Sequence, residues 1–390
     1  MSRSTLTALA LVLLLFPARG KSAEVEQVPG RWPAQKARAW YDAQPWLVGC
    51  NYIPATAINQ LEMWQADTFD METMTRELGW AKDLGFNTLR VYLHDLVWKQ
   101  DAAGLYQRID RFLTLCDNNG IKVLFVFFDD CHRPDPVAGV QPPCVKSFHN
   151  SGWAKSPARE LLMRYHDGKA SAEEKAYLKG YVQETMRRFK DDKRVLLWEL
   201  YNEPGRSAGK RSVPLLMDAW RWAREVNPSQ PLCSTAEGSK GKVFIDIARA
   251  NSDVISFHCY QDKDLPALVA HYAKRARPAL CTEYMARPTS TFQVAMPILK
   301  KNRVAAINWG FVSGKTGTVW PWSANKGKDV NALRKQKDQV VQPGEAYPEP
   351  KLWFHDIYRI DGTPYSKEEI DFIRRMTSSN KNKPERVKTR

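Results

Sequence analysis

The sequence predicts an α/β protein built as a single (β/α)8 barrel of the TIM type. Short apolar segments alternate with amphipathic ones from about residue 45 to residue 376, which is typical of parallel strands joined by helices. Eight such strands are found, and no second domain's worth of sequence is left over. These two observations favour one closed barrel over an open, doubly wound sheet.

The predicted strands are short and mostly apolar. Residues 121–128 form a continuous apolar run, which is typical of a strand buried on both faces. The eight strands are predicted at residues 46–52, 86–93, 121–128, 195–203, 232–236, 254–260, 279–284 and 304–311.

The helices between the strands are predicted from apolar residues at helical spacing. In residues 70–84, for example, Met71, Met74 and Leu78 share one face. Gly120 ends another helix, since glycine readily adopts the conformation that stops a helix. Helices are predicted at residues 70–84, 109–118, 172–190, 214–226, 243–250, 265–275, 291–301, 351–357 and 367–376.

The two ends of the chain are predicted to lie outside the barrel domain, which spans residues 45–378. Residues 1–20 combine a basic start, an apolar run and small residues near Gly20, as secretory signal peptides do. The apolar run is short for a membrane span. We therefore expect a secreted or periplasmic protein without integral membrane association, with a lead-in at 21–44 and a basic, disordered tail at 379–390.

The net charge of +15 does not by itself indicate a nucleic-acid partner. Lysines and arginines alternate with acidic residues along the predicted helices, as on solvated helix faces. A weak affinity for acidic polysaccharide is compatible with this charge. None of the seven cysteines or seven histidines has metal-site spacing, so no metal or cofactor is predicted. Cys131 and Cys144 bracket a proline-rich loop and are candidates for a disulfide.

Two predicted strands end at a glutamate. The apolar strand from residue 195 stops at Asn202-Glu203-Pro204, and the strand from residue 279 stops at Glu283. The carboxyl ends of barrel strands meet at one face, where these folds keep their active sites. Cleavage of a glycosidic bond needs two such carboxylates, because one protonates the leaving oxygen and the other attacks or stabilises the anomeric carbon. The sequence therefore predicts a glycoside hydrolase.

Two long connections, 129–170 and 312–350, follow strands and so belong to this same face. Loops of this length are usually functional. Their aromatic side chains are suited to stacking on sugar rings. The polar and aromatic candidates in these loops are Asp129, Asp130, His132, His149, Trp153, Trp320 and Trp322.

The order of motifs over roughly residues 45–360 resembles glycoside hydrolase clan A, and most closely family 5, the cellulase-like enzymes. The resemblance implies a retaining β-glycosidase of the endo-β-1,4-glycanase type. The resemblance further implies that Glu203 is the general acid/base, that Glu283 is the nucleophile, and that Asn202 binds the 2-hydroxyl of the sugar. Neighbouring strand residues point oppositely, so presenting both Asn202 and Glu203 requires a twist or bulge at the strand end.

Further residues match this clan. His258-Cys259-Tyr260 ends the sixth strand like the clan's His-x-Tyr motif. Period-two alternation turns His258 and Tyr260 inward and Cys259 toward the helices, and the same parity turns Cys281 inward below Glu283. The resemblance implies that Tyr260 hydrogen-bonds the nucleophile and that His258 contacts substrate. It also implies two roles at other strands: Arg90 keeps the nucleophile ionised, and Trp309 is a platform under the sugar.

The chain departs from family 5 after the third strand, where the family usually has a histidine. This chain has Asp129-Asp130, with His132 two residues beyond. We take Asp130 and His132 as substrate-binding candidates, with His94 after the second strand as an alternative. The remaining polar residues considered are Glu62, Trp64 and Gln65 as a possible rim, Glu237 as a weaker substrate contact, and Glu199 as structural.

The predicted partner is a β-linked carbohydrate of the xylan, glucan or mannan type, acted on by a monomer without cofactors. A transglycosylase using the same two glutamates is one alternative reading. A barrel that binds sugar without cleaving it is a second, and a basic adhesion protein of the cell envelope is a third.

Overall fold

The strands form one parallel sheet that curves into a barrel in the computed structural model, which describes residues 25–378. The strand order is β5-β4-β3-β2-β1-β8-β7-β6, and each paired neighbour is parallel. A parallel bridge between Thr235 and Ser256 joins the β5 and β6 ends of the sheet. The strands are β1 (Val48–Asn51), β2 (Thr88–Tyr92), β3 (Lys122–Asp129), β4 (Val195–Asn202), β5 (Leu232–Cys233), β6 (Ile255–His258), β7 (Ala279–Glu283) and β8 (Ala305–Asn308). The predicted (β/α)8 barrel is confirmed.

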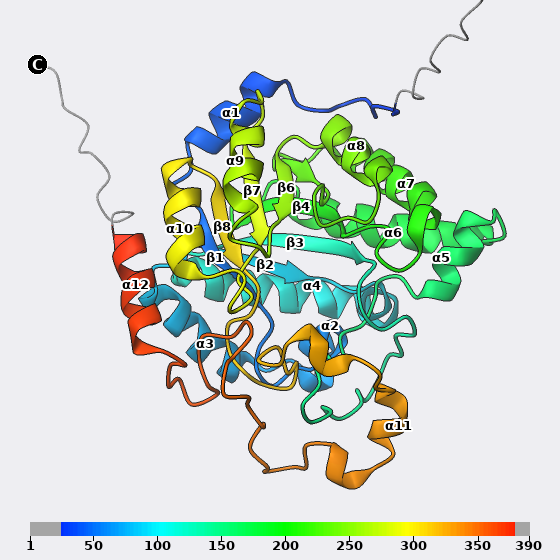
Figure 1. The fold of residues 1–390 in the computed structure, drawn as a ribbon. Coiled ribbons are helices and arrows are strands. Elements are labelled where there is room, and N and C mark those ends of the chain that lie inside the picture. The colour runs from blue at the N-terminus through cyan, green and yellow to red at the C-terminus, as the bar shows by residue number, and fades with distance from the viewer. Residues whose placement is uncertain (1–24, 379–390) are drawn as a thin grey trace, which may run out of the picture.

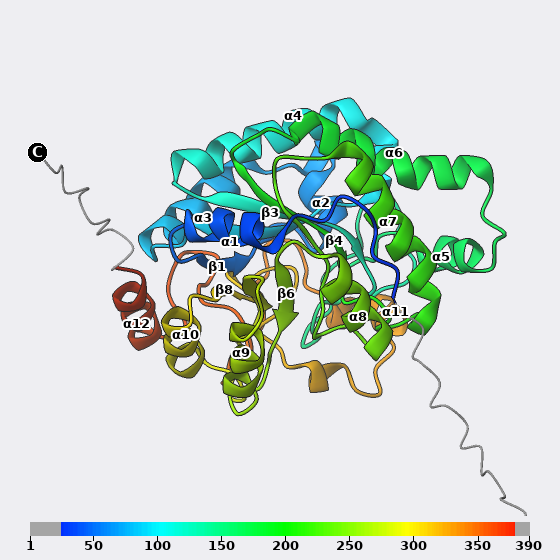
Figure 2. The same cartoon turned by 90° about the horizontal axis from the view of Figure 1, so that it is seen from above.

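The helices lie around the outside of the sheet (Figures 1 and 2). The α-helices are α1 (Ala34–Asp42), α2 (Gln60–Trp64), α3 (Met71–Asp83), α4 (Asp95–Asn118), α5 (Arg159–His166), α6 (Ala172–Phe189), α7 (Val213–Val226), α8 (Lys242–Asn251), α9 (Leu265–Ala273), α10 (Phe292–Lys301), α11 (Val330–Arg334) and α12 (Lys367–Ser378). Short 3-10 helices are η1 (Ala66–Thr68), η2 (Gly209–Ser212), η3 (Trp322–Asn325) and η4 (Lys337–Gln339). Figures 1 and 2 both show α12 beside α10.

The core has two apolar layers separated by the sheet. One fills the barrel with side chains such as Leu124, Leu280 and Ile307. The other lies between strands and helices and includes Phe125 and Phe257. Because strand residues alternate between the two sides, each strand contributes to both layers. The packed interior fixes the strand ends, and with them the side chains that emerge there.

Two predictions about local structure are wrong. Residues 351–357 are not helical: this segment is irregular with bends, and its backbone bonds to other parts of the chain, since Phe354 N donates to Val319 O and Ile357 N donates to Phe311 O. Cys281 is a buried thiol as expected, but it packs in the layer next to the helices rather than inside the barrel. The pairing of β6 with β7 shifts register after Phe257, so period-two parity does not carry through to Glu283.

The lead-in before the barrel is held to the strand β6 region. Val28 N and Trp32 N donate to the side chains of Asn251 and Asp253. The predicted signal at 1–20 and the tail at 379–390 lie outside the described residues, and both stay predictions. Within residues 25–378, no helix is long and apolar enough to cross a membrane.

The two long loops bind each other. Val145 forms a bridge with Val340, and Asn325 exchanges hydrogen bonds with the backbone of His149. Arg334 donates to Ser151 O. In Figure 1 the segment that carries α11 lies along the lower edge of the molecule. We call loops 129–158 and 312–350 together the loop wall, since hydrogen bonds unite them into one surface.

Candidate active site

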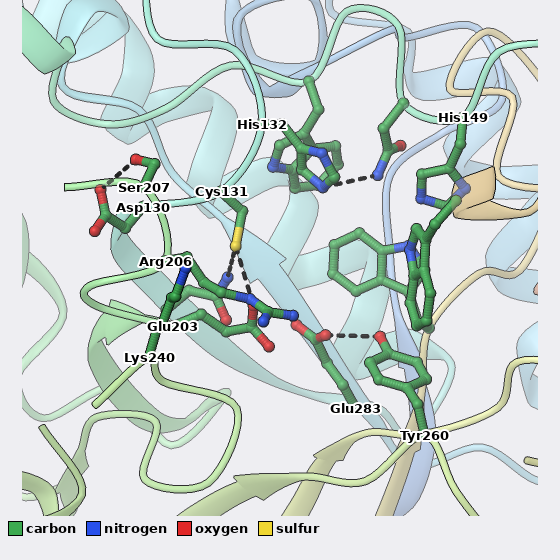
Figure 3. A pocket seen from close by; sticks show the side chains of 15 residues that line it. Asp130, Cys131, His132, His149, Glu203, Arg206, Ser207, Lys240, Tyr260 and Glu283 are labelled. Carbon is green, nitrogen blue, oxygen red and sulfur yellow. Dashed lines mark hydrogen bonds and ion pairs between the residues drawn. The ribbon is translucent and has the colours of Figure 1, made fainter. Parts of the chain in front are cut away.

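A cavity of about 380 Å³ lies at the carboxyl ends of the strands (Figure 3). Most of the residues singled out in the sequence meet here, and Arg90 and His258 contact the two glutamates from behind the lining. The lining residues are Asp130, Cys131, His132, His149, Asn150, Trp153, Asn202, Glu203, Arg206, Ser207, Lys240, Tyr260, Glu283, Trp309 and Trp322.

The two strand-end glutamates face each other across His258. One carboxylate oxygen of Glu203, one of Glu283 and a ring nitrogen of His258 all lie within 4.8 Å of one another. His258 Nδ1 is 2.8 Å from Glu203 Oε1 and 3.3 Å from Glu283 Oε2. Both glutamates are buried. The arrangement places two carboxylates close enough to act on one reacting centre.

The end of β4 turns so that neighbouring residues reach the cavity together. Glu203 has φ 42°, a left-handed conformation that is costly for a residue with a side chain. This turn presents both Asn202 and Glu203 to the cavity, as the sequence required. At Gly238, after β5, a Cβ would lie 2.8 Å from His258 Nδ1 and 3.0 Å from Glu203 Oε1. The loop passes this close to His258 and Glu203 only because it has no side chain there.

Glu283 is held by a buried arginine and two tyrosines. Arg90 NH1 donates to Glu283 Oε1 at 2.7 Å, and Tyr260 OH donates to Glu283 Oε2 at 2.7 Å. Tyr92 OH donates to Oε1 at 3.2 Å. Arg90 is itself fixed by two bonds to Glu199, at 2.9 and 2.8 Å. Donors to both oxygens hold the carboxylate of Glu283 in one orientation.

Glu203 is surrounded by different partners. Arg206 Nε donates to Glu203 Oε2 at 2.9 Å, and Cys131 Sγ donates to the same oxygen at 3.1 Å. Burial opposes ionisation of Glu203, but His258, Arg206 and the Cys131 thiol outweigh it and lower the pKa of Glu203 below its usual range. These partners favour the ionised form of Glu203.

Asn202 is fixed at both ends of its amide. Its Oδ1 accepts from Arg90 NH2 at 2.7 Å, and its Nδ2 donates to Asp129 Oδ1 at 2.9 Å. Trp153 Nε1 donates to the other oxygen of Asp129 at 2.9 Å. Burial raises the pKa of Asp129 to about 6. Asp129 thus occupies the end of β3 and orients both Asn202 and the indole of Trp153.

Asp130 lies in the cavity wall, but both of its oxygens are engaged. Oδ2 accepts from Gly205 N and Ser212 Oγ, each at 2.8 Å. Oδ1 accepts from Ser207 Oγ at 3.1 Å and lies 3.4 Å from Lys155 Nζ. In this structure Asp130 anchors the segment after Glu203, and its predicted contact with substrate stays a prediction.

One side of the cavity is aromatic. Trp309 packs edge-on against Trp153, with ring centroids 5.3 Å apart, and Trp322 packs against Tyr260 at 5.0 Å. Burial lowers the pKa of His132 to about 3 and that of His149 to about 4, so both imidazoles are neutral at ordinary pH. These neutral imidazoles and aromatic rings give this side of the cavity flat surfaces that suit a sugar ring.

Other candidates from the sequence lie elsewhere. None of them lines this cavity. Glu62 pairs with Lys315, Trp64 Nε1 donates to Tyr92 O, and Gln65 bonds Gly139. Glu237 accepts from Tyr272 and Arg249. His94 Nδ1 caps helix α4 by accepting from Leu96 N.

The predicted disulfide is wrong, since Cys131 and Cys144 are both free thiols. Their sulfurs have different partners: Cys131 Sγ donates to Glu203, whereas Cys144 Sγ lies 3.7 Å from Val145 O. Cys131 thus belongs to the site and not to a structural crosslink.

Among the described residues, the one cluster with the donors and spacing of a metal site is Glu203, His258 and Glu283. Arg90 and Arg206 already hydrogen-bond these two carboxylates. Two guanidinium charges beside the cluster repel a further cation, and the set fits acid–base chemistry better than metal binding.

The sequence reasoning missed several residues of the site. Tyr92 stands two residues after Arg90 on the same face of β2, so period-two alternation was a signal for it. Cys131 was considered only as a disulfide partner. Arg206 and Lys240 lie on loops, where no periodic pattern indicates direction.

The chain also matches a known protein family. The family model described as Cellulase (glycosyl hydrolase family 5) matches residues 51–311. No curated protein sequence matches the chain.

Solved structures share the fold at low sequence identity. An endo-beta-1,4-mannanase from Thermotoga petrophila superposes with TM-score 0.52 and 13% identity, covering 90% of this chain and 80% of that one. A family 5 protein from Bifidobacterium longum, solved with Manb1-4GlcNAc, gives TM-score 0.55 and 10% identity over 85% and 78% of the two chains. A family 5 protein from Streptomyces cattleya, solved with GlcNAc, gives TM-score 0.54 and 13% identity, covering 88% of this chain and 81% of that one.

Proposed function

Because the chain belongs to glycosyl hydrolase family 5, we propose that it cleaves β-glycosidic bonds with retention of anomeric configuration. The observation that carries this proposal is that one oxygen of Glu203 and one of Glu283, from two different strand ends, lie within 4.8 Å of each other. Retaining glycosidases hold their carboxyl groups about 5–5.5 Å apart, whereas inverting ones need about 6.5–9.5 Å to admit a water molecule. The short approach supports the retaining arrangement.

In the first step, Glu283 attacks the anomeric carbon while Glu203 gives its proton to the leaving oxygen. Arg90, Tyr92 and Tyr260 hold the carboxylate of Glu283 in place, since each donates to one of its oxygens. Glu203 must first take up a proton before it can act as the acid, and His258 Nδ1 lies 2.8 Å from its Oε1.

In the second step, Glu203 acts as base on the water that releases the sugar from Glu283. His258 contacts both carboxylates and stays within reach of the proton through both steps. Asn202, fixed by Arg90 and Asp129, is placed for the hydroxyl next to the anomeric carbon. Trp309 supplies the aromatic surface beneath the ring.

We propose a β-1,4-linked backbone of the xylan, glucan or mannan type, cut internally, as the substrate. The fold neighbours include an endo-beta-1,4-mannanase and a protein solved with Manb1-4GlcNAc, so mannan and glucomannan belong on any panel. The exported state expected from residues 1–20 is part of the same proposal, and N-terminal sequencing of the secreted protein tests it.

The test is reducing-sugar release on xylan, glucomannan, carboxymethyl-cellulose, mixed-linkage glucan and aryl β-glycosides. We expect release by the wild type on at least one substrate and loss of release in Glu283→Gln. Glu237→Gln is the matched control, because this glutamate lies outside the cavity. Silence of the folded wild type on every substrate contradicts the proposal and favours a sugar-binding barrel. Lengthened products in place of hydrolysis favour a transglycosylase.

A further inference from the structure

The cavity has a cationic side opposite its aromatic side. Figure 3 shows Arg206 and Lys240 near Glu203, and His149 and Tyr260 across the cavity from them. The two cations belong to different loops, after β4 and after β5. Lys240 N donates to Pro204 O at 3.2 Å, which joins the second loop to the turn that carries Glu203.

Arg206 has unused hydrogen-bonding capacity. Its Nε donates to Glu203 Oε2, and the side chain is 53% exposed. Within residues 25–378, no acceptor is hydrogen-bonded to its terminal NH1 and NH2 groups. A guanidinium presents five N–H donors in a planar fork that matches carboxylate, sulfate and phosphate oxygens. Four of those donors therefore remain for a ligand.

Lys240 is an exposed cation of the lining without a counter-ion among the described residues. The other lysine near this wall, Lys155, is buried against Asp130, 3.4 Å from its Oδ1. Asp130 also holds Gly205 N, Ser207 and Ser212, so the segment that carries Arg206 is anchored beneath the exposed guanidinium.

The cationic side borders the leaving group. The general acid delivers its proton to the oxygen that leaves, so the leaving sugar extends past Glu203. The other ring lies over Glu283, near Tyr260 and Trp309. Arg206 and Lys240 flank Glu203 and therefore face the leaving sugar.

Resting on the proposed function, we propose that the substrate carries an anionic group, a carboxylate or a sulfate, on its leaving-group side. Arg206 and Lys240 bind this group. When the guanidinium of Arg206 binds the anionic group of the substrate, it no longer pairs with Glu203. The carboxylate of Glu203 then takes up its catalytic proton more readily. Binding of the anion thereby prepares the general acid, which makes these two residues specificity determinants.

The test has a binding arm and a kinetic arm. Calorimetry at low ionic strength compares D-glucuronate and D-glucose 6-sulfate with neutral D-glucose, and the two anions distinguish carboxylate from sulfate. Kinetics compare two aryl glycosides of one sugar whose leaving phenols differ by a carboxylate. The variants are Arg206→Gln and Lys240→Gln, with Lys210→Gln plus Arg211→Gln as control. The control pair removes from η2, outside the cavity lining, as much charge as the two test variants remove together.

We expect the wild type to bind one of the anionic sugars more tightly than glucose. Each single variant lowers the anionic-to-neutral ratio of kcat/KM about tenfold, the scale of one lost charge-assisted hydrogen bond, and the control keeps it. Equal binding of anionic and neutral sugars by the wild type overturns the inference, as does a preference that survives both substitutions. If no glycoside is turned over, the proposed function fails, and the calorimetry still decides the inference.

Discussion

Glu283 and Glu203 each have an arginine partner, but the two arginines are built differently. Arg90 is completely buried and donates to Glu199, Asn51, Tyr92 and Asn202 as well as Glu283. Arg206 is half exposed, and its side-chain hydrogen bond among the described residues is the one to Glu203.

The difference matches the chemistry proposed for each carboxylate. A nucleophile must be ionised whenever substrate arrives, so a permanent counter-ion suits it. An acid/base must gain and lose a proton in every turnover, and a permanent counter-ion would prevent the gain. A cation on the surface can be displaced by substrate, whereas one tied to five partners within the barrel cannot.

The largest expected effect comes from removing the proton that Glu203 supplies. Glu203→Gln should lower kcat on oligosaccharides by about 10²- to 10⁴-fold, the usual contribution of general acid–base catalysis. The loss should be smaller on aryl glycosides with acidic leaving phenols, which need less protonation. Steady-state kinetics on both substrates check this, and azide, a nucleophile that needs no base, should restore turnover. An equal loss on both substrates without azide rescue would remove Glu203 from the acid/base role.

Substitution of the two arginines should separate stability from catalysis. Arg90→Gln leaves the buried Glu199 and Glu283 without their cation, which should lower the free energy of unfolding by about 3–5 kcal/mol. Arg206→Gln should change it by less than about 1 kcal/mol, because exposed ion pairs contribute little. Denaturant titrations of both variants give the comparison. Similar losses of unfolding free energy in the two variants would contradict the contrast between a buried structural arginine and an exposed one.

The pH profile tests whether Arg206 acts on Glu203. The cation lowers the pKa of Glu203, so Arg206→Gln should raise that pKa. The protonated acid then persists to higher pH, and the basic limb of kcat/KM should move upward by about one unit, the low end of the effect of a neighbouring charge. Arg211→Gln serves as the control. An unmoved limb, or one moved to lower pH, would contradict the assigned effect.

The smallest expected effect concerns the thiol beside the acid/base. Cys131→Ala removes one donor to Glu203 and should lower kcat/KM about three- to tenfold, as for one hydrogen bond. Cys131→Ser retains a donor and should recover part of the loss. Cys144→Ala, in the loop wall, should keep full activity. A Cys131→Ala variant with wild-type kinetics would leave this hydrogen bond without a role.

The sequence predicted the site residues that stand at the ends of strands. Glu203 and Glu283 could be placed because a buried strand that stops at a carboxylate delivers it to the active face of a barrel. Alternation along one strand placed His258 and Tyr260 together. The same rule failed for Cys281, because the register shift between β6 and β7 is a tertiary feature with no local signal.

The positions of the loop residues could not be predicted from the sequence. Arg206 reaches Glu203 because Gly205 adopts φ 84° and Asp130 fixes the turn from 75 residues away. The pattern of residues 351–357 predicted a helix, yet their backbone bonds to Phe311 and Val319 after β8, and the segment is irregular. Such contacts depend on the assembled barrel and not on the residues nearby in the chain.

The most direct measurement is to trap the covalent intermediate with a 2-deoxy-2-fluoro glycoside of the sugar that the panel identifies. The fluorine slows release of the sugar, so a glycosyl group accumulates on the nucleophile and mass spectrometry locates it. A label on the peptide that contains Glu283, and none on Glu283→Gln, is the predicted result. A label on Glu203, or products formed with inverted anomeric configuration, would contradict the double-displacement account.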